Sequence, residues 1–204
     1  MFQTLPNRIT FKEFVEWKAD GVRYELHDGV IVEMTQPLGG HEEITGFLTL
    51  ELSAEIKRLK LPYLVPKQAL VKPLESESGY LPDILILNRP SLASEPLWEN
   101  ESTVSLATSI PLVVEVVSTN WRDDYYKKYG EYEGIGIPEY WIVDYLANGG
   151  RKFIGNPKLP TISIYSLIEG EYQVSQFRGN EQIESSTFPE LNLTAEEIFS
   201  AGIV

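Results

Sequence analysis

Two short stretches of the chain are almost wholly aliphatic, and each contains one carboxylate. The first, Pro82–Leu87, carries Asp83, and the second, Pro111–Val117, carries Glu115. Continuous aliphatic runs of this length are typical of strands that are buried on both faces of a sheet. A buried, ionised carboxylate is costly unless a metal, a cation or several donors compensate it. The pattern therefore predicts two neighbouring inner strands whose acids share one site.

Periodicity and turn signals predict the elements around these strands. Apolar residues recur at helical spacing from His41 to Leu59, which predicts a long amphipathic helix with Phe47 and Leu50 widening its apolar face. Asp28-Gly29 joins two alternating runs over 22–34 into a hairpin. Capping boxes at Thr10 and Thr194 predict a helix over 11–19 and a terminal helix. Further strands are expected at 63–65, 68–71 and 140–144, and a hairpin is expected of 163–167 with 172–177. A helix is expected over 122–134, and a polar connection with a short helical piece over 88–110.

Together these elements predict a single α+β domain with a mixed central sheet. We expect the long helix on one face of the sheet, the helix over 122–134 on the other, and the hairpins at the edges. A length of 204 residues suits one domain. Within it, residues 1–36 would form an N-terminal helix and hairpin, residues 37–144 the core, and residues 145–204 a C-terminal hairpin and helix.

The charge of the chain is acidic overall but uneven. A formal net charge of −13 disfavours a general nucleic-acid binder, because such domains are usually basic. Residues 57–72 nevertheless carry five lysines or arginines and no acid, whereas residues 169–197 carry seven glutamates and one arginine. The basic strip Lys57–Lys72 is compatible with a contact to DNA phosphates, and equally with an ordinary solvated surface.

Several classes of site are excluded or disfavoured by what the sequence lacks. There is no cysteine, which excludes disulfides, thiolate metal sites and cysteine nucleophiles. Two histidines disfavour a histidine zinc site, and neither a glycine-rich phosphate loop nor a Gly-x-Ser-x-Gly elbow occurs. No segment approaches the roughly 20 apolar residues of a membrane span, and residues 1–20 lack the order of a signal peptide. We therefore expect a cytoplasmic protein without a membrane partner.

The two buried acids have the chemistry of a magnesium or manganese site. Asp83 and Glu115 supply hard carboxylate oxygens, and the backbone carbonyl of Val116 could add a third ligand. Two carboxylates alone would repel each other and raise the pKa of one of them. The site therefore makes electrostatic sense only with a metal or a nearby ammonium.

The helix over 122–134 offers that ammonium. Asp124, Lys128 and Tyr132 are spaced at i, i+4 and i+8, which places them on one helix face. If this face is turned to the sheet, Lys128 can polarise a metal-bound water or neutralise charge on a phosphate oxygen. Two alternatives stay open at this point: Asp124 and Lys128 could form an ordinary surface pair, or Lys127 could take the place of Lys128.

Other side chains are accessory candidates for the same site. Glu25 could face the pocket from the first hairpin or simply pair with Arg23 or a lysine. His41 could contact phosphate or make a structural hydrogen bond at the helix start. Gln68 could touch a metal-bound water from the strand before Asp83. The four tyrosines within 122–134 could stack on bases, although core packing accounts for most of them equally well.

The motifs occur in a specific order along the chain. They are Tyr24-Glu25-Leu26, Asp28-Gly29, His41, Pro82-Asp83, Glu115-Val116-Val117-Ser118, Asp124, Lys128, Tyr132 and Gly136-Ile137-Pro138-Glu139-Tyr140-Trp141-Ile142-Val143-Asp144. This ordered set resembles the Uma-type restriction-endonuclease-like family of the PD-(D/E)XK nuclease superfamily. The resemblance runs from residue 24 to residue 144 and continues more weakly to the C-terminus.

The resemblance implies a restriction-endonuclease-like fold and a phosphodiesterase in which Asp83 and Glu115 bind Mg²⁺ or Mn²⁺. Val117 stands where the superfamily has a lysine two residues after the glutamate. In Uma-type proteins that lysine is similarly displaced onto the following helix, which corresponds to Lys128 here. We therefore expect a metal-dependent endonuclease that acts on DNA.

Two other functions remain open at this stage. One is a catalytically silent nuclease-fold module that binds nucleic acid or protein, and the other is a sugar- or lipid-phosphate hydrolase with the same metal chemistry. The retention of Lys128 together with both carboxylates favours the nuclease. The long edge hairpins and the acidic surface suit a homodimer.

Overall fold

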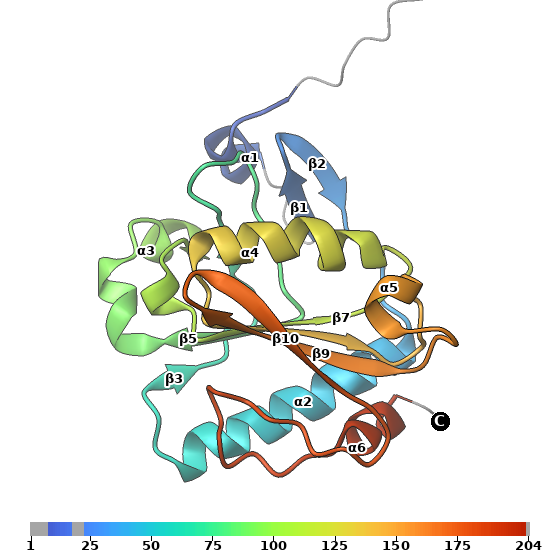
Figure 1. The fold of residues 1–204 in the computed structure, drawn as a ribbon. Helices are drawn as coiled ribbons and strands as arrows, with labels where there is room; N and C mark the ends of the chain where they lie inside the picture. The colour runs from blue at the N-terminus through green and yellow to red at the C-terminus, as the bar shows by residue number, and fades with distance from the viewer. Residues whose placement is uncertain (1–7, 18–22, 203–204) are drawn as a thin grey trace, which may run out of the picture.

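The computed structural model describes residues 8–17 and 23–202 of the chain. Its centre is a six-stranded sheet in the order β10-β9-β8-β7-β5-β3 (Figure 1). The sheet is mixed, because β7 and β8 run parallel whereas the other neighbouring pairs run antiparallel. The mixed central sheet expected from the sequence is therefore confirmed. Its strands are β3 (Tyr63–Leu64), β5 (Ile84–Asn88), β7 (Leu112–Val116), β8 (Glu139–Asp144), β9 (Thr161–Ile168) and β10 (Glu171–Phe177).

The register of the two inner strands places the two acids opposite each other. Ile84, the first residue of β5, pairs with Val114 of the antiparallel strand β7. Asp83 immediately precedes Ile84, and Glu115 immediately follows Val114, so the two acids occupy facing positions. The fold thus brings together two carboxylates that are far apart in the sequence.

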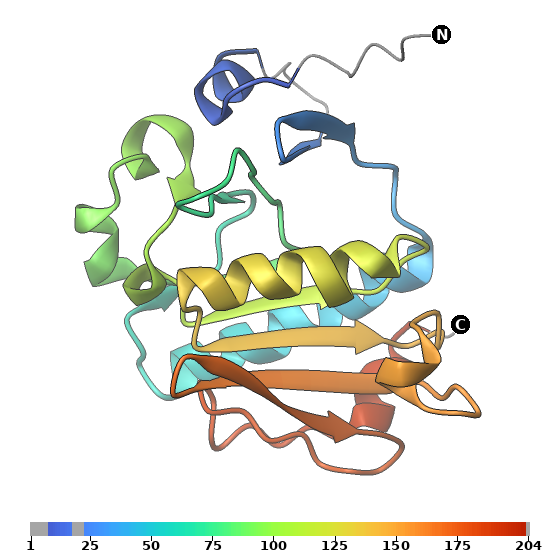
Figure 2. The ribbon, with the colours of Figure 1, turned by 45° about the horizontal axis from the view of Figure 1, so that its top comes forward.

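Helices cover both faces of this sheet, as expected (Figure 2). The long helix α2 (Gly39–Arg58) and the terminal helix α6 (Ala195–Ser200) lie on one face. The crossover between β7 and β8 lies on the other face as a π-helical segment, η3 (Asp123–Lys128), that continues into α4 (Tyr129–Ile135). A cluster of buried apolar side chains fills the space on each face, so the sheet is covered on both sides.

The apolar face of α2 is narrower than the sequence suggested. Ile44, Leu48 and Leu52 are fully buried against the sheet, but Leu50 is 68% exposed. The expectation that Leu50 widens the buried stripe is therefore wrong. Two residues correspond to a rotation of roughly 200° around an α-helix, so Leu50 points away from the sheet that buries Leu48.

The first hairpin forms a small sheet of its own. β1 (Tyr24–His27) and β2 (Val30–Glu33) pair with each other, and a single bridge between Leu26 and Gly79 links them to the connection before β5. The turn at Asp28-Gly29 is confirmed, with both residues at positive φ. The expected place of this hairpin at an edge of the central sheet is wrong.

The apolar side of this hairpin is covered by the N-terminal helix instead of by a neighbouring strand. α1 (Phe11–Trp17) contributes Phe11 and Phe14 to a third cluster that also contains Leu26 of β1. The capping box that begins α1 is confirmed, because Thr10 and Glu13 exchange hydrogen bonds. The last two residues of the helix expected over 11–19 lie outside the described residues.

The connection after β5 is more ordered than the expected polar loop. The buried carboxylate of Glu95 accepts hydrogen bonds from the backbone N–H groups of Ser105 and Leu106 at 2.9 and 3.0 Å. A buried acid that satisfies backbone donors in this way fixes the path of the chain. The elements in and beside this connection are β4 (Leu70–Val71), η1 (Arg89–Ser94), α3 (Trp98–Glu101), β6 (Thr103–Val104), which pairs with β4, and η2 (Ala107–Ser109).

The C-terminal part completes the fold. The hairpin of β9 and β10 lies at one edge of the central sheet, as expected, and Thr194 begins α6 with a full capping box. A short helix, α5 (Arg151–Ile154), lies between β8 and β9. None of the helices in the described part of the chain is both long and apolar enough to cross a membrane. The division into residues 1–36, 37–144 and 145–204 stays a prediction.

Candidate active site

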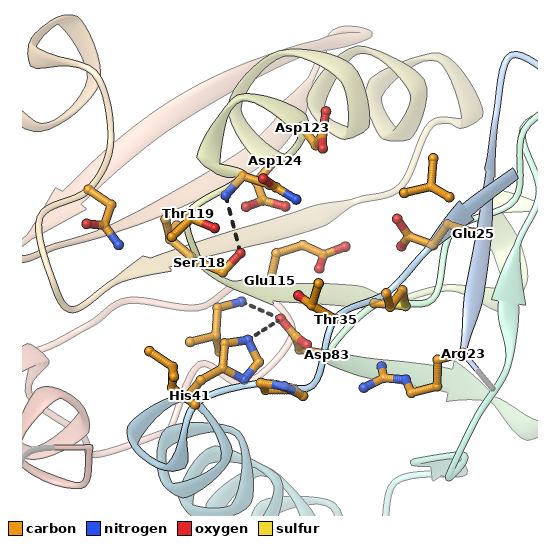
Figure 3. A pocket seen from close by; sticks show the side chains of 18 of the residues that line it. Arg23, Glu25, Thr35, His41, Asp83, Glu115, Ser118, Thr119, Asp123 and Asp124 are labelled. Carbon is orange, nitrogen blue, oxygen red and sulfur yellow. Dashed lines mark hydrogen bonds and ion pairs between the residues drawn. The ribbon is translucent and has the colours of Figure 1, made fainter. Parts of the chain in front are cut away.

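A cavity of about 450 Å³ opens beside the end of β7, between the start of α2, the η3 segment and the first hairpin (Figure 3). Its walls include Glu25, Asp83, Glu115 and Asp124, together with Lys128. These side chains come from the hairpin, the two inner strands and the crossover helix, which is the continuous helix formed by η3 and α4. The cavity is therefore assembled by the tertiary fold.

Asp83 is held in the cavity by two donors. Its Oδ2 accepts a hydrogen bond from the backbone N–H of Val116 at 2.8 Å and lies 3.2 Å from Nε2 of His41 (Figure 3). Burial lowers the pKa of His41, but the neighbouring Asp83 outweighs this and raises the pKa above its ordinary value. His41 therefore makes a structural hydrogen bond to Asp83, and it makes none that caps α2.

Lys128 lies at the centre of the remaining acids. Its Nζ is 3.1 Å from Glu115 Oε1, 3.2 Å from Glu25 Oε1 and 3.7 Å from Asp124 Oδ1. The lysine is only 5% exposed and Asp124 only 7% exposed, so these two do not form the surface pair considered as an alternative. The structure thus brings Glu25, Glu115, Asp124 and Lys128 into one buried cluster.

The crossover helix presents three of its side chains to this cluster. Tyr132 donates a hydrogen bond from its hydroxyl to Glu115 Oε1 at 3.0 Å, one helical turn beyond Lys128. The π-helical winding of η3 contains both Asp124 and Lys128. Such wide turns recur at functional sites because they re-aim side chains relative to the rest of a helix. Lys127, the alternative to Lys128, instead pairs with Asp28 at 2.7 Å and does not line the cavity.

The cluster is electrostatically unbalanced. Burial raises the pKa of Glu115 well above its ordinary value; Lys128 opposes this, whereas Asp83, Asp124 and Glu25 add to it. Burial likewise raises the pKa of Asp124 to about 7. Glu25 differs, because the attraction of Lys128 and His27 outweighs the effect of burial and lowers its pKa to about 2. The cavity therefore holds more negative charge than its own cations neutralise.

The chain matches the family described as "Uma2: Putative restriction endonuclease" over residues 11–196. The chain belongs to this family. The resemblance drawn from the ordered motifs is thereby confirmed.

A solved structure supports the Uma2 assignment at the level of the fold. It is described as a "putative nuclease belonging to DUF820" from Anabaena variabilis ATCC 29413, and it matches with a TM-score of 0.73 and 17% sequence identity. The match covers 96% of this chain and 99% of that chain. None of the curated proteins matches the chain.

Gln68 is one candidate that the structure does not bring to the Uma2 site. It lies in an exposed bend before β4 and does not line the cavity. The strand expected over 68–71 begins only at Leu70, so Gln68 is not carried toward Asp83. Its expected place beside a metal-bound water is therefore wrong.

The basic strip Lys57–Lys72 does not lie at the cavity either. His41 is at the start of α2, and Lys57 follows it by sixteen residues near the other end of the helix. At a rise of about 1.5 Å per residue, the two are roughly 24 Å apart along the helix axis. Arg58 is moreover paired with Glu55 and Glu190. The part of the strip on α2 is thus remote from the acids and partly neutralised.

Most tyrosines of the crossover helix pack in the core, as expected from the alternative to base stacking. Tyr125 and Tyr132 are buried, and Tyr129 packs its ring against Tyr165 at 5.1 Å between centroids. Tyr126 is the exception, because 50% of it is exposed. Tyr126 is therefore the one tyrosine of these four that is half exposed at the surface.

Arg23 is a site residue that the sequence analysis treated only as a partner for Glu25. It lines the cavity, and its guanidinium points inward (Figure 3). Its Nε is buried and has no hydrogen-bond partner among the described residues. The spacing of Arg23, Glu25 and His27 in the sequence could have indicated this, because alternate residues of a strand share one face and Arg23 would then face the same way as Glu25.

The oxygen atoms in the cavity that could coordinate a metal suit a hard divalent cation. The carboxylates of Asp83 and Glu115 and the adjacent carbonyl of Val116 are oxygen ligands of the kind that Mg²⁺ and Mn²⁺ prefer. No group of three or more histidine, aspartate or glutamate side chains could hold a metal by itself within residues 8–17 and 23–202. Any ion held by Asp83 and Glu115 would therefore need other oxygen ligands to complete its coordination.

Proposed function

We propose that this chain is a metal-dependent endonuclease that hydrolyses phosphodiester bonds of DNA. One observation carries the proposal: a member of a restriction-endonuclease family places Asp83 and Glu115 in facing positions beside the amine of Lys128, in an open cavity. Two acids and one lysine around a single point are the parts that metal-assisted hydrolysis of a phosphodiester needs.

Asp83, Glu115 and the carbonyl of Val116 would hold a Mg²⁺ or Mn²⁺ ion. When bound, such an ion lowers the pKa of a coordinated water and stabilises the negative charge that develops on the phosphate. The pKa of Glu115 is raised first by burial and then by repulsion from the neighbouring acids, and a bound cation would oppose both effects, which supports this assignment.

The protein's own residues position these ligands and handle the proton. His41 and the N–H of Val116 fix the orientation of Asp83, while Tyr132 and Lys128 fix that of Glu115. In the reaction, a water oxygen bonds to phosphorus, an ester P–O bond breaks, and the leaving oxygen takes up a proton. Asp124 lines the cavity 3.7 Å from the amine of Lys128, and we assign it to the exchange of that proton.

Arg23 supplies the positive charge that holds the substrate. Among the other cations of the cavity, Lys128 contacts three carboxylates and His41 contacts Asp83 through Nε2, while its Nδ1 is buried without a hydrogen-bond partner in the described part of the chain. Arg23 retains a buried donor without a partner. An arginine fork matches two oxygens of a phosphate, so we assign Arg23 to the phosphodiester group in the cavity.

Cellular location and assembly belong to the same proposal. The lack of cysteine suits a cytoplasmic setting. A homodimer is supported by the edge strand β10, whose Val174 is 51% exposed. Light scattering behind a sizing column measures the assembly directly.

The deciding experiment is conversion of supercoiled plasmid to nicked and linear DNA. We expect cleavage with Mg²⁺ or Mn²⁺ and none after EDTA treatment, because the reaction needs the ion held by the two acids. The Asp83→Asn protein, purified in the same way, controls for contaminating nucleases. Equal cleavage by both proteins, or none by either, would favour the catalytically silent binding module.

Arg23→Ala is expected to raise KM for a DNA substrate about 10- to 100-fold, with a smaller change in kcat. The range corresponds to the roughly 1.5–3 kcal/mol of a charge-assisted hydrogen bond. Guanidinium ion added to the Arg23→Ala protein should restore part of the affinity. Arg89→Ala, which removes an exposed arginine of η1, is the matched control and should leave KM unchanged. An unchanged KM in Arg23→Ala would remove Arg23 from the site.

A further inference from the structure

An aromatic and basic surface lies beside the active-site cavity. It consists of Trp121, Arg122, Tyr126, Lys152 and Phe153, which we call the aromatic corner. Tyr126 is 50% exposed, Arg122 and Lys152 are exposed, and Trp121 and Phe153 are partly exposed. The corner joins the start of the crossover helix to α5, at the same end of the molecule (Figure 1).

The rings of the aromatic corner form a contiguous group with cations on top of it. The centroids of Tyr126 and Phe153 are 5.1 Å apart, and each lies 6.2 Å from that of Trp121. Arg122 lies over Trp121 at 4.5 Å, and Lys152 lies over both Tyr126 and Phe153 at 4.6 Å. Each of the three rings thus has the charged end of an arginine or a lysine over it.

The aromatic corner is continuous with the cavity wall. Ser118, Thr119 and Asn120 line the cavity and lead directly into Trp121. On the other side, Asn148 lines the cavity and is followed by Gly149 and Gly150. A Cβ on Gly150 would lie 2.9 Å from the outer edge of the Trp121 ring, so the two segments meet closely here. Both segments that line the cavity therefore lead directly into the aromatic corner.

The α5 side of the aromatic corner is basic, although the chain as a whole is acidic. Residues 145–168 contain Arg151, Lys152 and Lys158 and no acid, in a protein whose formal net charge is −13. On the other side, Arg122 lies over Trp121 and is followed by Asp123 and Asp124, which line the cavity. This corner is therefore complementary to a phosphate backbone, and it is adjacent to the cavity, unlike the strip Lys57–Lys72.

We propose that the aromatic corner binds a single-stranded stretch of the nucleic acid that is cleaved in the cavity. Exposed rings recognise bases by stacking, and only unpaired bases offer both faces for it. Arg122 and Lys152, which lie over the rings in the free protein, would move aside and neutralise the phosphates of the same stretch when bases take their place on the rings. This inference rests on the proposed nuclease function and adds the substrate class: nucleic acid with an unpaired segment, such as a single strand or a frayed end.

The test measures binding separately from cleavage. Fluorescence anisotropy would compare a labelled 12-residue oligothymidylate with a 12-base-pair duplex, with Ca²⁺ in place of Mg²⁺. The wild-type protein should bind the single strand more tightly. Tyr126→Ala and Trp121→Ala should each weaken this binding about tenfold, in line with the loss of one stacked base. Arg122→Gln with Lys152→Gln should make the binding less sensitive to salt.

Two matched controls define the result. Trp17→Ala removes another exposed ring, which lies on α1, and Lys57→Gln with Lys60→Gln removes two charges from the remote strip. Neither should change binding. Equal affinity for duplex and single strand, or unchanged binding in Tyr126→Ala, would overturn the inference even if the protein cleaves DNA. Loss of self-association in these variants would reassign the corner to a protein interface. Retained single-strand binding without cleavage would overturn the nuclease function alone.

Discussion

The Asp83→Asn protein is expected to cleave plasmid DNA at least about 10³-fold more slowly than the wild type. The substitution removes one of the two carboxylates that would hold the metal, and the ion's stabilisation of phosphate charge is worth several kcal/mol. Asparagine keeps an oxygen that can accept the hydrogen bond from Val116, so the fold should persist. Initial nicking rates measure the loss, and titration calorimetry with Mn²⁺ should show weakened binding.

Glu42→Gln is the matched control for Asp83→Asn. It also removes one negative charge near the start of α2, but its side chain is 57% exposed and does not line the cavity. Because exposed charges are screened by solvent and salt, its rate should stay within about twofold of the wild type. If Asp83→Asn also retained its full rate, the metal assignment and the proposed hydrolysis would both be wrong.

Lys128→Met is expected to lower the free energy of unfolding by about 3–5 kcal/mol. Removing one partner of a buried ion pair leaves an uncompensated buried charge, which is the costly situation. Methionine keeps the length and the apolar stem of lysine but leaves Glu25 and Glu115 without their ammonium. Urea unfolding followed by circular dichroism measures the change.

The neighbouring residue provides the control for Lys128→Met. Lys127 makes one ion pair, with Asp28, whose side chain is 53% exposed, so Lys127→Met should cost no more than about 1 kcal/mol. Adding Glu115→Gln to Lys128→Met should restore part of the lost stability, because a buried charge disappears with its partner. Equal stability of the two lysine variants would show that the cluster is not held by Lys128.

The same cluster gives stability a pH dependence that these variants should change. The pKa of Glu25 is lowered to about 2 from an ordinary value of 4.5, because the attraction of Lys128 outweighs burial. Its contribution is therefore complete above about pH 4.5 and is lost as the pH falls toward 2. Asp124 has the opposite sign: burial raises its pKa to about 7, so its contribution declines as the pH rises from about 4 through 7. Lys128→Met should reduce the first effect.

The sequence predicted the parts of the fold that local pattern determines. The aliphatic runs around Asp83 and Glu115 gave the inner strands, because burial on both faces requires continuous apolar residues. The spacing of Asp124, Lys128 and Tyr132 gave a shared helix face, because helical geometry is regular over eight residues. The ordered motifs gave the family, since each motif reports a position in the same fold.

Other features depended on tertiary packing and could not be predicted from local pattern. Nothing around Gln68 shows that its strand starts two residues later, and charge counts do not show that Lys57 lies at the far end of α2 from His41. Arg23 was overlooked for a related reason. A donor without a partner is visible only once the neighbouring side chains have been placed.

The separate first hairpin has a consequence for how a long polymer enters. Arg23 and Glu25 form one wall of the cavity, yet their hairpin shares a single bridge, Leu26 with Gly79, with the chain that leads into the large sheet. Swinging this wall outward would break three backbone hydrogen bonds between the hairpin and residues 77–79 and the hydrogen bond of Glu25 with Leu81. It would also break the ion pairs Lys128–Glu25 and Lys127–Asp28, but it would leave the six-stranded ladder intact. A strand without free ends could then be admitted sideways, which is the access that cutting within a closed circle demands.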